Sequence, residues 1–136
     1  MTTQHVIIAG GRDFTDTALM RSTLISLVEE GWLDSEPVIL CGMAKGADLT
    51  AFNLCKHEFN LNVLEYPADW KDLSEPCLIK HNRYGAYNAL AGMKRNIQMA
   101  MDADSLVAFW DGKSHGTKDM IDTMVKLGKH VKVINY

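Results

Sequence analysis

The segment HVIIAGGRDF, residues 5–14, joins a short apolar run to two consecutive glycines and an Arg-Asp pair. The apolar run is typical of a buried β-strand, and paired glycines let the backbone turn sharply where the strand ends. The same arrangement recurs at residues 38–42, VILCG, and at residues 105–117, where SLVAF precedes a loop with two glycines. The sequence therefore predicts several strands that each open into a glycine-containing loop.

Segments with helical periodicity fill the intervals between the apolar runs. We expect strands over residues 5–9, 38–41, 62–66, 105–109 and 131–134, and helices over residues 16–31, 47–58, 90–101 and 117–127. Alternation of strands and helices produces a parallel sheet, because right-handed crossovers place helices on its two faces. The predicted fold class is α/β: a doubly wound, five-stranded parallel sheet with helices on both faces, in one domain over residues 1–136.

Two parts of the chain bear on packing. In the helix at residues 90–101, the apolar residues expected to face the sheet are Leu90, Met93, Ile97, Ala100 and Met101. Residues 68–89 lack a clear period, and a short helix at residues 78–82 is one interpretation of them. The methionines of the last two helices fill the core or, alternatively, form the interface of a homodimer. They are Met93, Met99, Met101, Met120 and Met124.

Composition narrows the classes of partner. No apolar run reaches the roughly 18 residues that span a bilayer, and the N-terminus lacks a basic region followed by an apolar stretch. We therefore expect a cytoplasmic protein that does not associate with membranes. The 17 acidic residues outnumber 14 basic ones, which disfavours nucleic acid as a partner. Three cysteines without CxxC spacing, Cys41, Cys55 and Cys77, indicate reduced core thiols, with no metal and no cofactor.

Ligands of such sheets bind outside the carboxyl ends of the strands, so the glycine-containing loops are the candidate site. In the first loop Gly10 and Gly11 let the backbone approach a ligand, and Arg12 offers several donors to a phosphate or carboxylate. Asp13 either contacts the ligand or caps the next helix. Without a ligand, this loop is an ordinary strand-to-helix turn.

The second loop, CGMAKGAD at residues 41–48, leads into the N-terminus of a helix. Free amides and the positive end of the helix dipole favour an anion there, and Lys45 adds charge. Asp48 either favours the first helical turn or accepts from a ribose hydroxyl. The spacing matches neither the Walker loop nor GxGxxG. The candidate ligand-binding residues are Gly42, Met43, Ala44, Lys45, Gly46 and Asp48.

The third loop, WDGKSHGT at residues 110–117, again precedes a helix. Its small and hydroxyl residues favour an anion cradle, whereas a hydrated loop beside a buried tryptophan is the alternative. Trp110 is placed to stack on a base, and Asp111 to bind a sugar. The remaining candidate ligand-binding residues of this loop are Gly112, Ser114, Gly116 and Thr117.

Five ordered blocks together resemble the SLOG superfamily, which includes DNA-processing protein A and the Lonely-guy enzymes, and in particular its small YspA-related proteins of bacteria and phages. The blocks are GGRDF at 10–14, CGMAKGAD at 41–48, PADW at 67–70, AGMKRN at 91–96 and FWDGKSHGTKDMI at 109–121. The resemblance implies a Rossmann-like sheet that binds nucleotides or nucleotide-derived molecules at these loops. Arg95 and Asn96 then join the ligand site, with Trp70 or Trp110 against the base.

The resemblance departs from the Lonely-guy enzymes at one position. In those enzymes a helix arginine and a glutamate after a PGGxGT loop cleave a base from a ribose phosphate. Arg95 matches the arginine, but Met120 occupies the glutamate position and cannot handle a proton. Asp119 is one residue away, turned by about 100° on a helix. The candidate catalytic residues are therefore Arg95, Asp111 and Asp119, with Asp48 as another source of a carboxylate.

Three functions follow from the sequence. The leading hypothesis is binding of an ADP-ribose-like or nucleoside phosphate molecule, by a sensor or a sequestering protein. The alternative is an N-glycosidic hydrolase that acts on a nucleotide. Single-stranded DNA binding, by analogy with DNA-processing protein A, is disfavoured by the acidic charge balance. The long segment at residues 71–90 is a candidate lid or partner surface.

Overall fold

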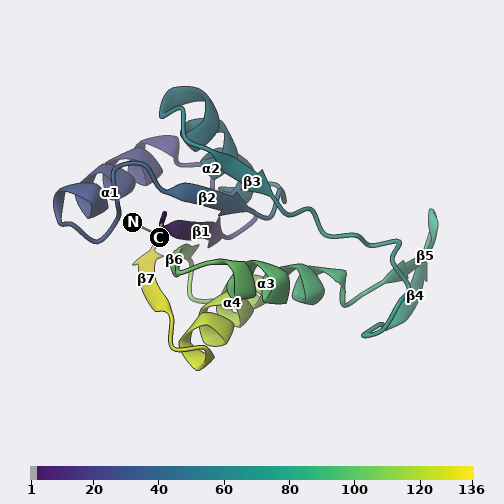
Figure 1. Cartoon of the computed structure of the whole chain (residues 1–136). Helices are drawn as coiled ribbons and strands as arrows, with labels where there is room; N and C mark the ends of the chain where they lie inside the picture. The colour runs from purple at the N-terminus through teal and green to yellow at the C-terminus, as the bar shows by residue number, and fades with distance from the viewer. Residues whose placement is uncertain (1–2) are drawn as a thin grey trace.

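The computed structural model describes residues 3–136 and contains a central sheet flanked by two helical layers, with a separate hairpin at one end (Figure 1). The elements in chain order are β1 (His5–Gly10), α1 (Thr17–Glu29), β2 (Val38–Cys41), α2 (Ala47–Asn53), the π-helical turn η1 (Leu54–Glu58), β3 (Val63–Glu65), β4 (Ile79–Asn82), β5 (Gly85–Asn88), α3 (Ala91–Asp102), β6 (Ser105–Trp110), α4 (His115–Lys126) and β7 (His130–Asn135).

The strand order determines where a ligand site can form. The sheet runs β3-β2-β1-β6-β7 and all neighbouring strands pair in parallel, with β1 at the centre. From β1 the chain first builds outward through β2 and β3, and later returns to the other side of β1 as β6 and β7. The order therefore reverses between β1 and β6, and a crevice is expected outside the carboxyl ends of these two strands.

Each face of the sheet is covered by its own pair of helices. On one face, α1 and α2 bury residues such as Met20, Leu24 and Ala51 against alternate residues of the central strands, including Ile8 and Phe109. On the other face, α3 and α4 bury Met99, Ala100, Met120 and Met124 against Ile7, Leu40 and Leu106. The predicted doubly wound α/β class is confirmed.

The inward face of α3 differs from the predicted one. Ala100 is buried, as predicted, but Met93, Ile97 and Met101 are exposed, whereas Met99 is buried. The side of α3 that faces the body of the protein carries Ala91, Arg95 and Met99 at intervals of four residues. Because this stripe includes a charged residue, an apolar period alone selects the wrong face of the helix.

The interpretation of residues 78–82 as a helix is wrong. They contain β4, which pairs with β5 in an antiparallel hairpin, with Ile79 opposite Asn88 and Asn82 opposite Gly85. The hairpin is joined to none of the five strands of the main sheet and projects beyond the N-terminal end of α3 (Figure 1). We call residues 79–88 the hairpin arm. A two-residue turn closes the hairpin between Asn82 and Gly85, whereas a single helical turn without neighbouring turns is unstable.

The structure contains three free cysteines. Cys41 and Cys55 are buried free thiols in the core, as predicted. The same prediction is wrong for Cys77, a partly exposed free thiol that precedes the hairpin arm. Within residues 3–136, no helix combines the length and the apolar character needed to cross a membrane.

The close approach of three elements at Gly10 gives the first prediction. A Cβ on Gly10 would lie 2.5 Å from the Phe109 carbonyl oxygen and 2.8 Å from Ala47 Cβ. Gly10→Ala should therefore destabilise the fold by about 1–3 kcal/mol, because neither backbone can move freely. Gly116→Ala is the matched control, since a Cβ there meets nothing within 4 Å. Urea unfolding measures both; equal free energies of unfolding for the two variants would contradict this account.

Candidate functional site

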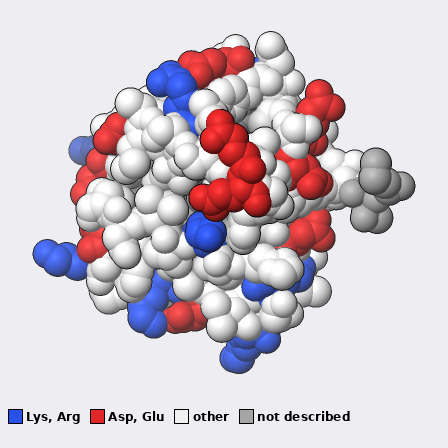
Figure 2. All heavy atoms as spheres, turned by 90° about the vertical axis from the view of Figure 1, so that its left-hand side faces the viewer, with Lys and Arg blue, Asp and Glu red and all other residues white. Residues whose placement is uncertain are grey.

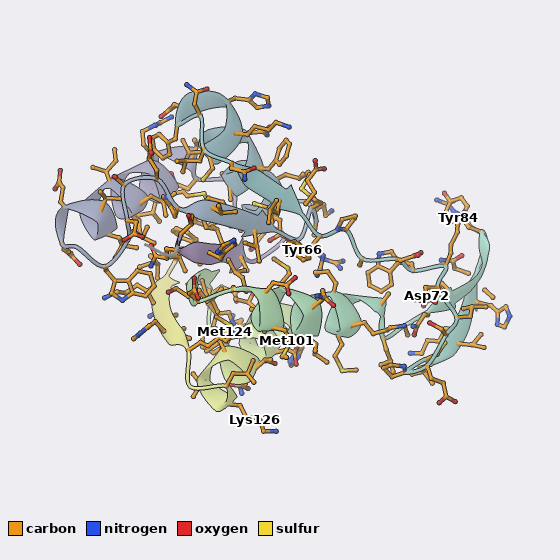
Figure 3. The ribbon with its side chains drawn as sticks, viewed as in Figure 1. Tyr66, Asp72, Tyr84, Met101, Met124 and Lys126 are labelled. Atoms are coloured by element: carbon orange, nitrogen blue, oxygen red, sulfur yellow. The ribbon has the colours of Figure 1, made fainter. Side chains whose placement is uncertain are left out.

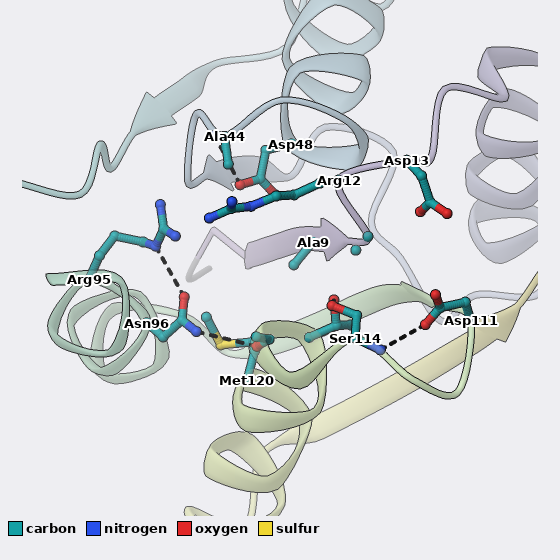
Figure 4. Close-up of a pocket in the computed structure, with 14 residues that line it drawn as sticks. Ala9, Arg12, Asp13, Ala44, Asp48, Arg95, Asn96, Asp111, Ser114 and Met120 are labelled. Carbon is teal, nitrogen blue, oxygen red and sulfur yellow. Dashed lines mark hydrogen bonds between the residues drawn. The ribbon is translucent and has the colours of Figure 1, made fainter. Parts of the chain in front are cut away.

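A cavity of about 430 Å³ opens at the carboxyl ends of β1 and β6, where the strand order reverses (Figure 4). All three glycine-containing loops and α3 contribute to it. The predicted residues that line it are Gly10, Gly11, Arg12, Asp13, Ala44, Asp48, Arg95, Asn96, Asp111, Ser114, Gly116 and Thr117. These predicted residues share the wall of one cavity, and the structure brings together residues that lie up to 107 positions apart.

The N-terminus of α4 supplies the free backbone donors of the cavity. Ser114 is the N-cap residue, but its side chain makes no capping bond to the helix. The first amide in this helix with an intrahelical partner is that of Lys118, which donates to the Ser114 carbonyl at 3.1 Å. The amides of His115, Gly116 and Thr117 have no hydrogen-bond partner among residues 3–136. Three unpaired amides at the positive end of a helix dipole favour an anion.

Asp111 and Trp110 hold the shape of this loop. Asp111 Oδ1 accepts from the amides of Lys113 and Ser114, both at 2.8 Å. These amides hold the pKa of Asp111 below its ordinary value. The Trp110 indole donates from Nε1 to the Ser114 carbonyl at 3.0 Å. Both side chains are therefore engaged by the loop itself, and Trp110 does not line the cavity.

The second loop uses its amides internally. The Ala44 amide donates to Asp48 Oδ2 at 3.2 Å, and the Ala47 amide donates to the Gly11 carbonyl at 3.1 Å. The sequence predicted an anion cradle in this loop as well, whereas these bonds leave the α2 end with fewer free donors than the α4 end. Its contribution to the cavity is instead the side chain of Asp48.

Asp48 is a buried carboxylate beside two arginines. It is only 8% exposed, and burial raises its pKa to about 6, against the opposing effects of the Ala44 amide, Arg95 and Arg12. The ion pairs found among residues 3–136 do not include it. Every fully buried polar side-chain atom in this part of the chain has a hydrogen-bond partner. Asp48 Oδ1, which makes no such bond, is therefore open to the cavity.

The side chain of Arg95 extends from α3 to the second loop, where hydrogen bonds fix it. Its Nη1 donates to the Gly42 carbonyl at 2.5 Å, and its Nε donates to Asn96 Oδ1 at 3.1 Å. Burial lowers the pKa of Arg95. A Cβ on Gly42 would lie 2.7 Å from Nη1 and 2.8 Å from Asp48 Oδ2, so glycine leaves room for both charged groups. Gly42 therefore shapes the site from behind without lining it.

Arg12 and Asp13 lie at the exposed edge of the cavity. Arg12 makes no hydrogen bond with another described residue, and its side chain runs past Asp48 (Figure 4). Asp13 Oδ1 accepts from the Tyr136 hydroxyl at 2.6 Å. The cap of α1 is Asp16, which accepts from the Leu19 amide, so the alternative that Asp13 caps this helix is wrong.

The other predicted residues lie outside the cavity. Asp119 accepts from Asn96 Nδ2 at 3.2 Å and thereby positions Asn96. Trp70 is 41% exposed and lies near Gly92 on α3. Gly46, where φ is +88°, lets the second loop touch the backbone of Arg12. Three more predicted residues lie outside the cavity wall: Met43, Lys45 and Gly112.

Two lining residues were absent from the predicted ligand site. Ala9 and Met120 form apolar wall, and Met120 is 2% exposed. The position of Ala9 directly before the paired glycines could have indicated its place in the site. No sequence pattern indicates that Tyr136 contacts Asp13. Among residues 3–136, no group of three His, Cys, Asp or Glu side chains could hold a metal ion.

The raised pKa of Asp48 makes stability depend on pH. The unfolded chain releases this proton near the ordinary value, whereas the folded chain holds it to about pH 6, so folding stability falls as pH rises through that interval. Asp48→Asn should therefore be more stable than wild type at pH 7 by about 1–3 kcal/mol, and the difference should shrink towards pH 4. Urea unfolding at both pH values measures this. Asp34→Asn, at an exposed carboxylate, is the control; a pH-independent difference for Asp48→Asn would refute the assignment.

Comparison with solved structures shows the same fold in two DNA-processing proteins. The X-ray structure of DNA processing protein A from Streptococcus pneumoniae aligns with a TM-score of 0.69 and 18% identity, over 98% of this chain and 51% of that one. DNA processing protein A from Helicobacter pylori, described for its single-stranded DNA binding mode, aligns with a TM-score of 0.62 and 19% identity, over 99% of this chain and 66% of that one. The chain thus spans about half to two thirds of these proteins.

The family comparison covers the half of the chain that contains the first two glycine loops. No curated protein sequence matches the chain. The family model for the YspA, cpYpsA-related SLOG family matches residues 4–72, from the start of β1 through the PADW block. The chain belongs to the YspA, cpYpsA-related SLOG family.

Proposed function

We propose that this protein binds a nucleotide-derived small molecule, such as a nucleoside phosphate or an ADP-ribose-like compound, and acts as a sensor or sequestering protein. One observation carries the proposal. The unpaired amides of the α4 N-terminus, an unpaired arginine and a buried carboxylate share one cavity of about 430 Å³. That volume lies within the range of small-molecule sites.

The phosphate is assigned to the α4 end of the cavity. The amides of Gly116 and Thr117, two residues that line the cavity, donate to its oxygens, and the hydroxyls of Ser114 and Thr117, which lie 3.1 Å apart, are close enough to assist. Arg12 has no hydrogen-bond or ion-pair partner among residues 3–136 and completes the charge from the opposite loop. A guanidinium binds phosphate with several directed donors, which a lysine ammonium cannot do.

The sugar is assigned to Asp48. An ionised carboxylate whose Oδ1 faces the cavity accepts hydrogen bonds from vicinal hydroxyls, and the nearby guanidinium groups of Arg95 and Arg12 limit the cost of its charge. Ala9 and Met120 then offer apolar contact to the base. Trp110 is excluded from that role because its ring lies outside the lining and its N–H is bonded to Ser114.

Single-stranded DNA remains the weaker proposal. The likeness to the DNA-processing proteins is below 20% in identity and carries the fold alone. Acidic and basic side chains intersperse on the face turned away from the hairpin arm, and that face presents no continuous basic surface among the described residues (Figure 2). Release of counterions from a basic surface drives the binding of phosphate backbones, and in this chain 17 acidic residues outnumber 14 basic ones.

Isothermal titration calorimetry tests the proposal with AMP, ADP-ribose, ribose 5-phosphate and adenosine. We expect AMP or ADP-ribose to bind, with adenosine weaker because it lacks the phosphate. Arg12→Ala should weaken the binding by about 10- to 100-fold, since it removes one charge-assisted hydrogen-bonding group. Lys56→Ala is the matched control, because Lys56 lies on η1 over the Phe52 ring, outside the cavity. Wild-type protein that binds none of the four compounds would refute the proposal.

The raised pKa of Asp48 favours one second candidate, an N-glycosidic hydrolase. In that reaction water adds to C1′ of the sugar, the bond from C1′ to the base nitrogen breaks, and the base leaves with a proton. Asp119 is bonded to Asn96 outside the cavity, and Asp111 is occupied by the loop amides. Asp48 is therefore the carboxylate available for proton transfer, with Arg95 beside it.

Chromatography of free base after incubation with nucleotides separates the two candidates. If the protein is a hydrolase, wild type releases base and Asp48→Asn is slower by about 100-fold or more, since the amide cannot carry the proton. The variant retains the shape of the side chain, and calorimetry checks that it still binds ligand. Binding without release of base from any nucleotide would leave the protein as a sensor or sequestering protein.

A further inference from the structure

Six large apolar side chains are exposed along the hairpin arm and α3. Side chains that are more than one-third exposed follow one another along the arm and α3: Leu78, Ile79, Tyr84, Met93, Ile97 and Met101. Tyr84 lies at the tip of the arm and Met101 near the far end of α3 (Figure 3). Apolar surface concentrated in one region of a protein marks an interaction site.

The arm is held away from the body by a buried asparagine at its root. Asn88 is 0% exposed. Its Oδ1 accepts from the amides of Leu78 and Leu90, its Nδ2 donates to the Pro76 carbonyl, and its backbone amide donates to the Trp70 carbonyl. The position of the arm is thus fixed by satisfied hydrogen bonds, whereas its strands bury little of their own surface. An isolated two-stranded hairpin is marginally stable in water, so the arm benefits from a partner.

The exposed residues of α3 form a single stripe. Met93, Ile97 and Met101 succeed one another at intervals of four residues, so they lie on one side of the helix. Val125 of the adjoining α4 is 61% exposed. The stripe begins where the arm is rooted and ends at the C-terminus of α3. Arm and helix therefore belong to one surface, which the rest of the chain leaves uncovered.

Charge along this surface is divided between its two ends. From residue 76 to residue 101 the chain contains no Asp or Glu, and the arm carries Lys80 and Arg83. Asp102 is the last residue of α3 and Asp104 follows it, and both are exposed. Asp102 accepts from the Tyr66 hydroxyl and from Gln98 Nε2. Asp104 accepts from the His5 amide. Both carboxylates remain exposed, so this end of the surface presents negative charge to a partner.

We propose that the arm and the α3 stripe form the interface of a homodimer, in which the arm of each copy lies along α3 of the other. A two-fold axis places the two α3 helices antiparallel, which brings the basic arm of one copy to the acidic helix end of its partner, twice. The same surface is then apolar along its length and complementary in charge at its ends. A second copy of the chain fits this pattern because each copy carries both halves of it.

Sedimentation velocity tests the proposal with a pair of matched variants. Wild type should sediment as a dimer at micromolar concentration, and Ile97→Glu should raise the dissociation constant by about tenfold or more, because it buries a charge in the interface. Ile25→Glu on α1 is the control: Ile25 is 44% exposed and Ile97 is 45% exposed. A monomeric wild type overturns the proposal, and so does equal loss of dimer in both variants.

Charge reversal tests the arrangement of the two copies. The arm variant Lys80→Glu with Arg83→Glu should weaken the dimer, as should the helix-end variant Asp102→Lys with Asp104→Lys. An equimolar mixture of the two should recover it, because each arm then meets an opposite charge. Lys56→Glu is the control for a reversal elsewhere, and circular dichroism confirms that each variant is folded. If the helix-end variant unfolds, Asp104→Lys alone takes its place. A mixture that stays monomeric overturns the exchanged arrangement.

Nucleic acid is the competing occupant of a basic, aromatic arm. A fluorescent single-stranded oligonucleotide distinguishes the two, because binding to nucleic acid weakens as salt increases, whereas the apolar contacts of the dimer persist. We expect no binding that depends on Lys80 and Arg83. Oligonucleotide binding that the arm variant abolishes, together with a monomeric wild type, overturns the proposal and assigns the arm to nucleic acid.

Discussion

Contact between the first two glycine loops sets the geometry of the whole site. At Gly46, where φ is +88°, a Cβ would lie 2.5 Å from the carbonyl carbon of Arg12, and the Ala47 amide donates to the Gly11 carbonyl. These contacts bind the start of α2 to the end of β1, and they use the amide that the helix would otherwise present to a ligand. In the described part of the chain, no residue accepts a hydrogen bond from the first three amides of α4. The packing of two loops thus decides which helix end remains open to an anion.

Charge is retained in the cavity at a cost in stability. Asp48 and Arg95 are largely removed from water without forming an ion pair within 4.0 Å, so the favourable interaction between them only partly offsets desolvation. The bonds of Arg95 to the Gly42 carbonyl and to Asn96 fix the guanidinium, and Asp119 in turn fixes Asn96. Residues arranged at such expense are typical of functional sites, where shifted pKa values and fixed geometry serve a ligand.

Helix α3 contributes different side chains to the cavity and to the surface beside the hairpin arm. Arg95 and Asn96 face the cavity, while Met93 and Ile97 face outward beside the root of the arm. Consecutive residues of one helix therefore serve a polar site and an apolar surface that lie on different sides.

Local patterns along the chain determined the α/β class, the parallel sheet and the three loops that meet at β1 and β6, because strand periodicity and glycine turns depend on near neighbours. Tertiary structure decided the rest. The buried stripe of α3 includes Arg95 because a cavity lies beneath it, so an apolar period could not identify that face. Residues 79–88 form a hairpin whose root is fixed by long-range bonds to Asn88. Which amides stay free, and the contact of Asp13 with Tyr136 across 123 positions, follow from distant segments meeting in space, which no local pattern encodes.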